Sequence, residues 1–246
     1  MSKEVTNSPK ESNGEVADEE EAEVILHELR KEYSNPSEPF VLEDNMEGDP
    51  VKQFDIWFQN AVSEIDTSYC EANAVALSTV RDNRPSSRMV LMKGYSHNGF
   101  TFFTNAVSRK AQDLKLNPHA CMLFYWPHVD RQIRIEGEVE TLDEKAADEY
   151  WKKRPLPSRI GSKLSHQSAV IPSREYLEDR RMNLEKLAAK DGEDAITRPE
   201  SWLGYILKPN YFEFWQGQTN RVHDRLIYQL DEGNKESGWT LNRLSP

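Results

Sequence analysis

Short segments with the residue pattern of β-strands succeed one another through most of this chain, and they limit its fold more than any other feature. The clearest pair, residues 74–80 and 87–93, is separated by a turn at residues 81–85 and predicts a hairpin. In residues 131–139 apolar and polar side chains alternate, which is typical of a strand with one buried face. The full set of expected strands is residues 74–80, 87–93, 99–105, 120–126, 131–139, 202–207, 211–215, 222–229 and 239–244.

Helices are few, and the order of strands and helices indicates whether the sheet is parallel or antiparallel. One helix is expected after Asp49, which can cap it, with Pro50 in the first turn and apolar residues at helical spacing as far as Val62. Three more are expected at residues 108–116, 143–153 and 173–190. Because strand–helix–strand units do not repeat, the order favours an antiparallel barrel decorated by helices, a mainly β fold of the α+β class.

Composition divides the chain into three parts. Residues 1–23 are rich in Ser, Asn, Glu and Asp and cannot bury enough apolar surface to offset their ordering entropy, so we expect a disordered acidic tail. Residues 24–48 hold a short helix-like stretch that could dock as a lid, followed by a proline-containing connection. Residues 49–246 carry all the expected strands and are expected to form a single domain.

The charge and the cysteines argue against several classes of protein. The formal net charge is −11, so we expect no binding to nucleic acid or to a membrane, and any phosphate site must be a local basic island. The two cysteines, Cys70 and Cys121, argue against a disulfide framework and favour a cytoplasmic location. No apolar run is long enough to span a bilayer.

Common nucleotide and metal motifs are missing from the sequence. No two glycines are separated by a single residue and no glycine precedes a lysine, so neither a dinucleotide fingerprint nor a phosphate loop is present. The six histidines form no pair at helical spacing, and the two cysteines are far apart. A metal site formed by neighbouring residues in the sequence is therefore not expected.

A cationic helix start is the first indication of an anion site. Arg109 and Lys110 follow Ser108 where a helix is expected to begin, and positive side chains there oppose the helix dipole unless they share an anion. This conflict points to a phosphate. The alternative is that both side chains simply extend into solvent.

Tyr150, Arg154 and Ser158 form a second possible anion site. Tyr150 and Arg154 are four residues apart on one helix face, and Pro155 and Pro157 end that helix so that Ser158 can return toward the same ligand. The residues alone favour the plainer interpretation, in which the aromatic ring belongs to the core and Arg154 is a charge at a helix C-terminus.

The stretch from Phe214 to Arg225 places three hydrogen-bond donors at alternate positions. Arg221, His223 and Arg225 would share one face of a strand, and two guanidinium groups with an imidazole between them suit an anionic, planar ligand. A solvated polar strand face is an equally good interpretation of the spacing alone.

Other residues give weaker signals. Arg88 and Lys93 are five residues apart, which on a regular strand puts them on opposite faces and predicts different ligands, or one site reached from two subunits or around a bulge. The amides of Gln132 and Gln167 suit a ring whose edge alternates hydrogen-bond acceptors and donors. Trp215 could stack near the same ligand or pack in the core.

Taken in order, these segments resemble the pyridoxamine 5'-phosphate oxidases, a family of FMN-dependent enzymes. The resemblance extends from about Arg30 to Pro246, is to eukaryotic members, and rests on residues 88–94, 102–105, 108–110, 131–137, 165–168 and 215–225. It implies a split β-barrel homodimer with FMN bound noncovalently at the subunit interface.

The resemblance also implies roles for individual residues. The positions that match the family's FMN-binding residues are Arg88, Met89, Val90, Leu91, Phe103, Thr104, Arg109, Lys110, Gln132, Gln167, Ser168, Trp215 and Arg225. The positions that match its substrate-binding residues are Lys93, Tyr150, Arg154 and Ser158 around the substrate phosphate, and Arg221 and His223 over the pyridine ring. Arg221 and His223 are also the candidate catalytic residues. Arg30 and Tyr33 match a mobile N-terminal segment that can close over the site.

The activity that the resemblance implies is oxidation of the C4' carbon of pyridoxamine or pyridoxine 5'-phosphate to the aldehyde, with a hydride passing to the flavin and dioxygen reduced to hydrogen peroxide. Two rival interpretations are a noncatalytic split-barrel flavin binder and a flavin reductase-like enzyme with another substrate. Either rival is expected to lose some of the substrate positions. All six from Lys93 to His223 are present, which favours the oxidase.

Overall fold

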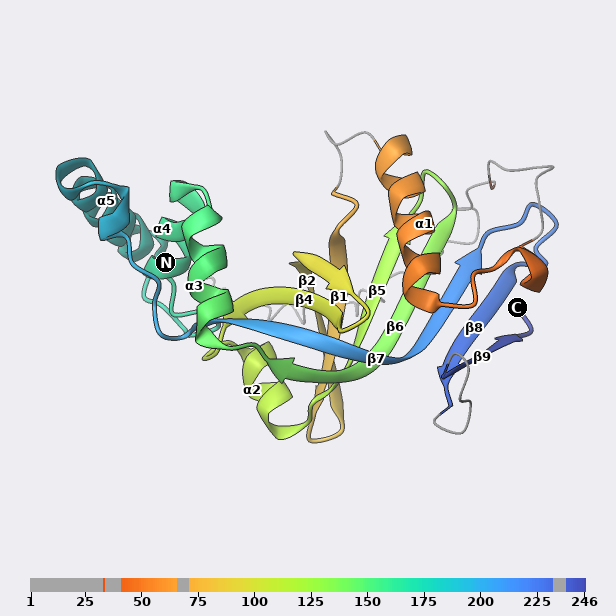
Figure 1. Ribbon diagram of the computed structural model, residues 1–246. Helices are drawn as coiled ribbons and strands as arrows, with labels where there is room; N and C mark the ends of the chain where they lie inside the picture. Colours follow the sequence, from red (N-terminus) through yellow and green to blue (C-terminus); the bar gives the residue numbers. More distant parts are fainter. Residues whose placement is uncertain (1–32, 34–40, 66–70, 232–237) are drawn as a thin grey trace, which may run out of the picture. The chain divides into compact units, whose positions relative to one another are not determined.

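A computed structural model of the chain describes residues 33, 41–65, 71–231 and 238–246, and it has the expected combination of an antiparallel sheet and helices (Figure 1). The helices are α1 (Pro50–Glu64), α2 (Arg109–Leu116), α3 (Glu144–Lys153), α4 (Leu156–Leu164) and α5 (Arg174–Asp191), with short 3-10 turns at Glu43–Asn45 and Glu193–Ala195. The strands are β1 (Ala74–Arg81), β2 (Arg84–Leu91), β3 (Gly94–Ser96), β4 (Gly99–Asn105), β5 (His119–Trp126), β6 (Arg131–Thr141), β7 (Trp202–Gln216), β8 (Asp224–Leu230) and β9 (Trp239–Arg243).

The strands form one sheet in which every pairing is antiparallel. Its order is β2-β1-β5-β6-β7-β4-β3, with β8 paired to β7 and β9 paired to β8. The antiparallel, mainly β prediction is confirmed. Among the described residues the sheet does not close into a ring, because β2 and β3 end the order without pairing to each other.

One long strand replaces two expected strands. Residues 202–207 and 211–215 were expected separately, but β7 runs through both, because a β-bulge opposite Glu136 and Gly137 absorbs the irregularity around Pro209. One edge of β7 pairs with β6, and the other edge is shared between β4 and β8. Residues at the two ends of β7 therefore have different neighbours.

Local signals in the sequence explain where several elements begin. The Asp49 carboxylate accepts a hydrogen bond from the backbone N–H of Val51 at 2.8 Å and caps α1, as expected. The hairpin of β1 and β2 is confirmed, and its turn is only Asp82 and Asn83, both with positive φ. Helix α4 was not expected, because Pro157 was interpreted as a helix end, whereas it lies in the first turn of α4.

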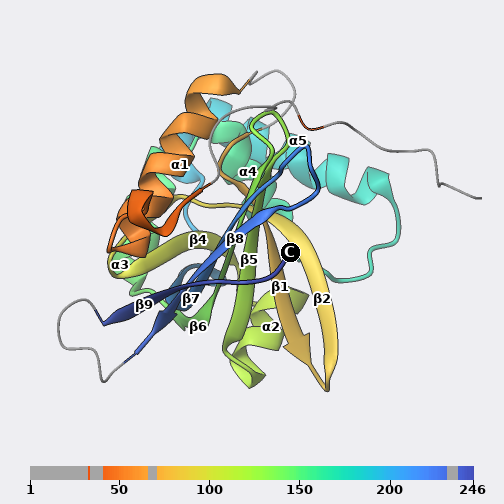
Figure 2. The ribbon, with the colours of Figure 1, turned by 90° about the vertical axis from the view of Figure 1, so that its right-hand side faces the viewer.

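Two apolar clusters hold the fold together. In the larger, Phe54 and Trp57 of α1 pack on aromatic residues of the sheet such as Phe100, Phe124 and Phe214. The smaller cluster joins α3, α4 and α5 to the beginning of β7 around Trp151 and Trp202. Figure 1 shows these three helices grouped at that end of β7, and Figure 2 shows α2 beside the β1–β2 hairpin.

Several expectations lie outside the described residues. They are the acidic tail at residues 1–23, the helix-like stretch before Tyr33, and the position of Arg30. Tyr33 itself is described and belongs to the compact unit Tyr33–Pro246. No helix in the described ranges is long and apolar enough to cross a membrane.

Candidate functional site

A cationic cluster forms where α2 begins, beside the end of β4. The Lys110 ammonium donates hydrogen bonds to Thr104 Oγ1 at 3.1 Å and to Gln167 Oε1 at 3.0 Å. The backbone N–H of Arg109 donates to Ser168 Oγ at 3.2 Å. Residues predicted from three distant segments thus lie together here. We call Thr104, Arg109, Lys110, Gln167 and Ser168, together with Arg88, the Lys110 cluster.

The Lys110 ammonium is buried without a carboxylate partner. Its side chain is 9% exposed, and no acidic group in the described part of the chain lies within ion-pair distance of it. Burial, assisted by the charge of Arg88, lowers the pKa of Lys110 to about 8. A buried cation held only by neutral acceptors is suited to an anionic ligand such as a phosphate.

Arg88 is fixed beside this cluster by neutral acceptors and one acid. Its Nη1 donates to Leu77 O at 3.0 Å and to Thr79 Oγ1 at 2.9 Å. The Thr79 hydroxyl in turn donates to the buried carboxylate of Asp113 at 2.8 Å. Burial lowers the pKa of Arg88, and the nearby Asp113 opposes that shift. Asp113 therefore holds Arg88 in place through Thr79.

The predicted substrate-phosphate residues contact one another through an aromatic stack. Tyr150 stacks on Phe103 with ring centroids 4.3 Å apart, and the guanidinium of Arg154 lies 4.7 Å from the centre of the Trp202 ring. Arg154 Nη2 also donates to the backbone carbonyl of Ser158 at 3.0 Å. The expected proximity of these three residues is present, although Ser158 lies on α4 rather than in a loop.

Three predicted cofactor residues form a row across β6, β7 and β8. Trp215 is directly opposite Gln132 on one side and Arg225 on the other. Arg225 Nε donates to Glu213 Oε1 at 2.7 Å, and Arg134 Nη2 donates to Glu213 Oε2 at 2.8 Å. These hydrogen bonds outweigh burial and lower the pKa of Glu213, so its carboxylate is charged.

The expected strand carrying Arg221, His223 and Arg225 is only partly present, and the prediction that all three share a strand face is wrong. Strand β8 begins at Asp224, so Arg221 and His223 lie in the loop of residues 217–223, and Arg221 has a left-handed φ of 66°. The N–H of Gly217 donates to the carbonyl of Asp130 at 2.8 Å and anchors the start of that loop. Within the loop, the N–H of Arg221 donates to the carbonyl of Gln218 at 3.2 Å. A compact loop, rather than an alternating strand, presents the two side chains.

Tyr33 lies against this loop. Its ring is 5.2 Å from that of His223 and 5.9 Å from that of Trp215, and the Arg221 guanidinium is 5.7 Å from its centre. A side chain at Gly217 would meet the Tyr33 ring at 2.6 Å, so glycine permits this close approach. We call Tyr33, Trp215, Arg221 and His223, with Gln132 and Arg225, the Trp215 cluster.

The Lys110 and Trp215 clusters lie toward opposite ends of β7. Thr104, in the first cluster, pairs with Leu203 near the start of β7, whereas Trp215 is almost at its end. Twelve residues separate Leu203 from Trp215, which corresponds to roughly 40 Å along an extended strand. Figure 1 shows β7 running from the α3 side of the sheet to β8. A single protomer therefore does not bring the two clusters together.

The remaining predicted residues lie on or just after β2. Met89 is 63% exposed, while Val90 packs on the larger core and Leu91 is half-buried. Lys93 follows the end of β2 and is exposed, and its backbone N–H donates to Thr101 O at 2.8 Å. Since β2 ends at Leu91, the argument from opposite faces of a strand does not apply to Arg88 and Lys93.

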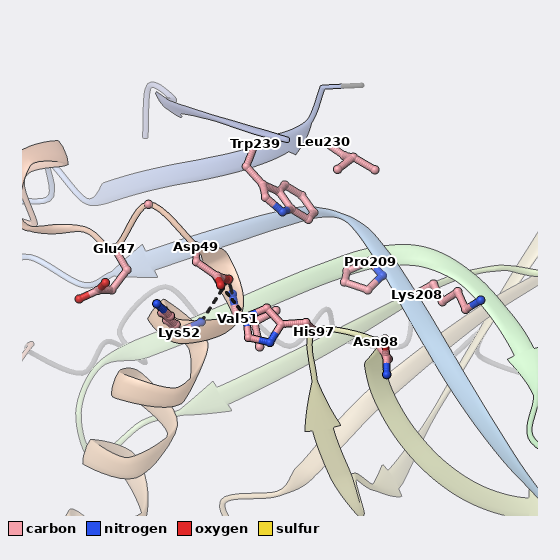
Figure 3. Close-up of a pocket in the computed structure, with 11 residues that line it drawn as sticks. Glu47, Asp49, Val51, Lys52, His97, Asn98, Lys208, Pro209, Leu230 and Trp239 are labelled. Carbon is pink, nitrogen blue, oxygen red and sulfur yellow. Dashed lines mark hydrogen bonds and ion pairs between the residues drawn. The ribbon is translucent and has the colours of Figure 1, made fainter. Parts of the chain in front are cut away.

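A cavity of about 800 Å³ elsewhere in the fold contains none of the predicted residues. It lies between the start of α1, the turn after β3, and strands β7 to β9 (Figure 3). The Asp49 carboxylate that caps α1 also meets His97 Nε2 at 2.6 Å on its wall. This contact joins the turn after β3 to the start of α1 and is structural. Since none of the predicted residues that the structure describes lines the cavity, it is not part of the candidate site.

Sequence reasoning missed four residues that hold the predicted ones in place. Asp113 and Glu213 form ion pairs with the predicted Arg88 and Arg225, and Asp224 accepts a hydrogen bond from Gln218 within the loop of residues 217–223. Glu213 carried a usable signal, because it alternates with the apolar Phe212 and Phe214 and so belongs to the polar face of its strand. Asp113 and Asp224 have partners in distant segments, whereas Gln218 contacts the nearby His223 and Asp224 through a loop that the expected strand did not predict.

Comparison with protein families finds two matches in this chain. Residues 61–186 match the family described as pyridoxamine 5'-phosphate oxidase. Residues 202–246 match the region described as pyridoxine 5'-phosphate oxidase C-terminal dimerisation region. The first match contains the Lys110 cluster, and the second contains Trp215, Arg221, His223 and Arg225.

Individual proteins resemble the chain over most of its length. A Caenorhabditis elegans protein that bears a provisional pyridoxamine 5'-phosphate oxidase name is 51% identical over 225 residues, which cover 91% of this chain and 98% of that protein. The pyridoxine-5'-phosphate oxidase of Bos taurus is 45% identical over 237 residues, covering 92% and 89%. The crystal structure of PhzG from Burkholderia lata, in complex with tetrahydrophenazine-1-carboxylic acid, has a TM-score of 0.75 at 30% identity and covers 86% of this chain and 100% of that one.

Proposed function

The chain belongs to the pyridoxamine 5'-phosphate oxidase family, and from that premise we propose that it oxidises pyridoxamine and pyridoxine 5'-phosphate to pyridoxal 5'-phosphate with FMN as cofactor and dioxygen as electron acceptor. The observation that carries the cofactor assignment is the buried Lys110 ammonium, which has only neutral acceptors around it. A phosphate is the ligand that such a site suits best.

FMN would be held by residues of both clusters. Arg88, Arg109 and Lys110 supply positive charge for its phosphate, and Gln167 and Ser168 supply further polar groups there. The row of Gln132, Trp215 and Arg225 offers an amide, an aromatic face and a guanidinium for the ring system. FMN would supply the acceptor for a hydride from the C4' carbon of the substrate and the route by which the electrons reach dioxygen to give hydrogen peroxide.

Two groups of residues would hold the substrate. Tyr150, Arg154 and Ser158, with Lys93, are suited to its phosphate, because the Tyr150 ring and the Arg154 guanidinium both pack on the Trp202 ring. Arg221 and His223 are suited to the pyridine ring and would orient the reacting carbon. Tyr33 contacts both and would cover the ring from the N-terminal side.

The geometry of His223 favours an orienting role over that of a general base. Its Nδ1 accepts a hydrogen bond from the backbone N–H of Gln218 at 3.0 Å, so the proton of the neutral imidazole is on Nε2. Burial, and then the charge of Arg221, lower the pKa of His223. At neutral pH Nδ1 is therefore the acceptor of the ring and Nε2 carries the proton, so Nε2 has no lone pair to receive another.

The separation of the two clusters along β7 supports a homodimer. If one FMN contacts both clusters, the two must come from different copies of the chain, since roughly 40 Å of strand divides them. A C-terminal dimerisation region matches residues 202–246, which include the Trp215 cluster's part of β7 and β8. We place the enzyme in the cytoplasm, which is supported by the free thiol of Cys121.

Purification followed by turnover tests this function. The protein is expected to carry one noncovalent FMN per subunit and to form equal amounts of pyridoxal 5'-phosphate and hydrogen peroxide from pyridoxine 5'-phosphate in air. A yellow protein that forms no aldehyde would instead indicate a flavin-binding protein without turnover. A folded protein that neither carries nor takes up FMN would refute the cofactor assignment itself.

A further inference from the structure

A buried carboxylate joins three separate segments beneath the loop that carries Arg221 and His223. Asp224 is 4% exposed, and both of its oxygens accept hydrogen bonds. Oδ2 accepts from the side-chain amide of Gln218 at 2.7 Å and from the backbone N–H of Val41 at 3.1 Å. Oδ1 accepts from Arg243 Nη1 at 2.6 Å. The start of β8 is thereby hydrogen-bonded to the loop through Gln218, to the segment before α1 through Val41, and to β9 through Arg243.

Gln218 connects this carboxylate to the imidazole. It is 7% exposed, its side chain donates to Asp224, and its backbone N–H donates to His223 Nδ1 at 3.0 Å. The side-chain hydrogen bond to Asp224 holds Gln218 in place, and the backbone N–H of Gln218 in turn holds the His223 ring. Because burial leaves little freedom to replace these bonds with water, loss of either partner leaves a buried polar group unpaired.

We propose that Gln218 and Asp224 are positioning residues for the reaction: the Gln218–Asp224 hydrogen bond holds the loop in the conformation that keeps the His223 proton on Nε2 and aims that N–H at the substrate. This inference rests on the proposed function for its catalytic consequence. The tautomer itself is a property of the protein and can be measured without substrate.

The surroundings of His223 define what a disturbed loop would change. Arg221 of the same loop, Asp224 of β8 and Tyr33 of the N-terminal segment face the imidazole, and Trp215 of β7 packs on it. Within the described part of the chain, the hydrogen bond from Gln218 is the one that distinguishes the two ring nitrogens. When that bond is lost, the ring is free to take the other tautomer and to rotate away from the substrate.

The test is the variant Gln218→Met, which keeps the length of the side chain and removes its amide, with Gln218→Ala as a smaller second variant. Nitrogen-15 NMR of the histidine rings, with the His223 signal assigned from its loss in His223→Gln, reports the tautomer. The wild type is expected to show a single Nε2–H form at pH 7.5. Both variants are expected to show a mixture of the two forms and a His223 pKa that moves toward the ordinary value.

Kinetics give a second, independent result. With FMN content unchanged, kcat is expected to fall about tenfold in both variants, since misplacing a reacting group by a small distance costs this much or more. Gln229→Met, at the exposed end of β8, is the matched control and should leave the His223 signals unchanged. An unaltered His223 tautomer in both folded Gln218 variants would overturn the proposal. If the wild type lacked turnover, the proposed function would fail, while the NMR result would still decide whether Gln218 positions the ring.

Discussion

Arg225 Nε lies 2.7 Å from Glu213 Oε1, so a residue predicted to bind the cofactor is itself bound by a buried carboxylate on the neighbouring strand. The other oxygen of Glu213 accepts from Arg134, and Arg225 Nη1 donates to Ser245 O at 2.9 Å. Two of the three nitrogens of Arg225 are thus occupied by these contacts, and the guanidinium is fixed before any ligand arrives. Preorganisation of this kind lowers the entropy that binding must overcome.

Replacing Glu213 by Gln is expected to weaken FMN binding about tenfold. The amide keeps the volume but can accept from only one of the two arginines, and the lost charge-assisted hydrogen bond is worth about 1.5 to 3 kcal/mol, part of which appears in the orientation of Arg225. Fluorescence titration of the apoprotein with FMN measures the effect. Glu140→Gln is the control, because Glu140 forms an exposed ion pair with Lys208. Equal FMN affinity in the wild type and Glu213→Gln would show that Arg225 needs no such support.

Lys110→Met is expected to weaken FMN binding by roughly ten- to a hundredfold while leaving the apoprotein at least as stable as the wild type. Burial holds the pKa of Lys110 at about 8, below its usual 10.5, which corresponds to a penalty of about 3 kcal/mol for the buried charge at neutral pH. Methionine removes that penalty together with the hydrogen bonds to Thr104 and Gln167.

The same pKa shift predicts how stability depends on pH. Between pH 8 and 10.5 the unfolded chain holds the Lys110 proton more tightly than the folded apoprotein, so this group makes the free energy of unfolding increase as pH rises through that window. The free energy of unfolding measured in urea is therefore expected to differ less between wild type and Lys110→Met at pH 9.5 than at pH 7.5, or to differ in the opposite direction. Lys115→Met, exposed on the same helix, controls for general alkaline effects. A difference that stays constant with pH would mean that Lys110 titrates normally.

Tyr33→Ala is expected to raise the KM for pyridoxine 5'-phosphate several-fold and to leave FMN affinity unchanged. The Tyr33 ring packs on His223 and Trp215 and lies beside Arg221, so its loss exposes the residues proposed to hold the pyridine ring. Steady-state kinetics with FMN in excess measure KM. Tyr176→Ala, on α5, removes an aromatic ring from another surface and should change neither value. If FMN were lost instead, Tyr33 would have to be reassigned to the cofactor.

Mixed dimers test whether one FMN site is built from two copies. Lys110→Met and Arg225→Ala disable different clusters, and each homodimer is expected to have little activity. A heterodimer of the two variants has both halves intact at one of its two sites, so the purified heterodimer should have roughly half of wild-type activity and an unseparated random mixture roughly a quarter. Coexpression with two affinity tags isolates the heterodimer for assay. Activity no higher than that of the homodimers would place both clusters of a site in one protomer.

The sequence by itself determined most of the local structure. Asp49 and Pro50 begin α1, Ser108 caps α2, and the turn at Asp82 and Asn83 closes the first hairpin. These features depend on residues within a few positions of one another, since caps, tight turns and strand alternation are satisfied by nearby backbone groups. The residues of the two clusters were also identifiable from the sequence, through their resemblance to a known family.

Only the tertiary structure decided which of those residues meet. Pairing across the sheet made one strand of β7 and made β8 begin at Asp224, so that Arg221 and His223 lie in a loop. It also gave Arg225 and Gln218 their carboxylate partners, Glu213 and Asp224. The pairing of β7 with β8 sets these contacts, and Asp224 is also bound by Val41 and Arg243 from distant segments. No short stretch of sequence contains that information, because a shift of one residue in pairing would turn each side chain to the opposite face of the sheet.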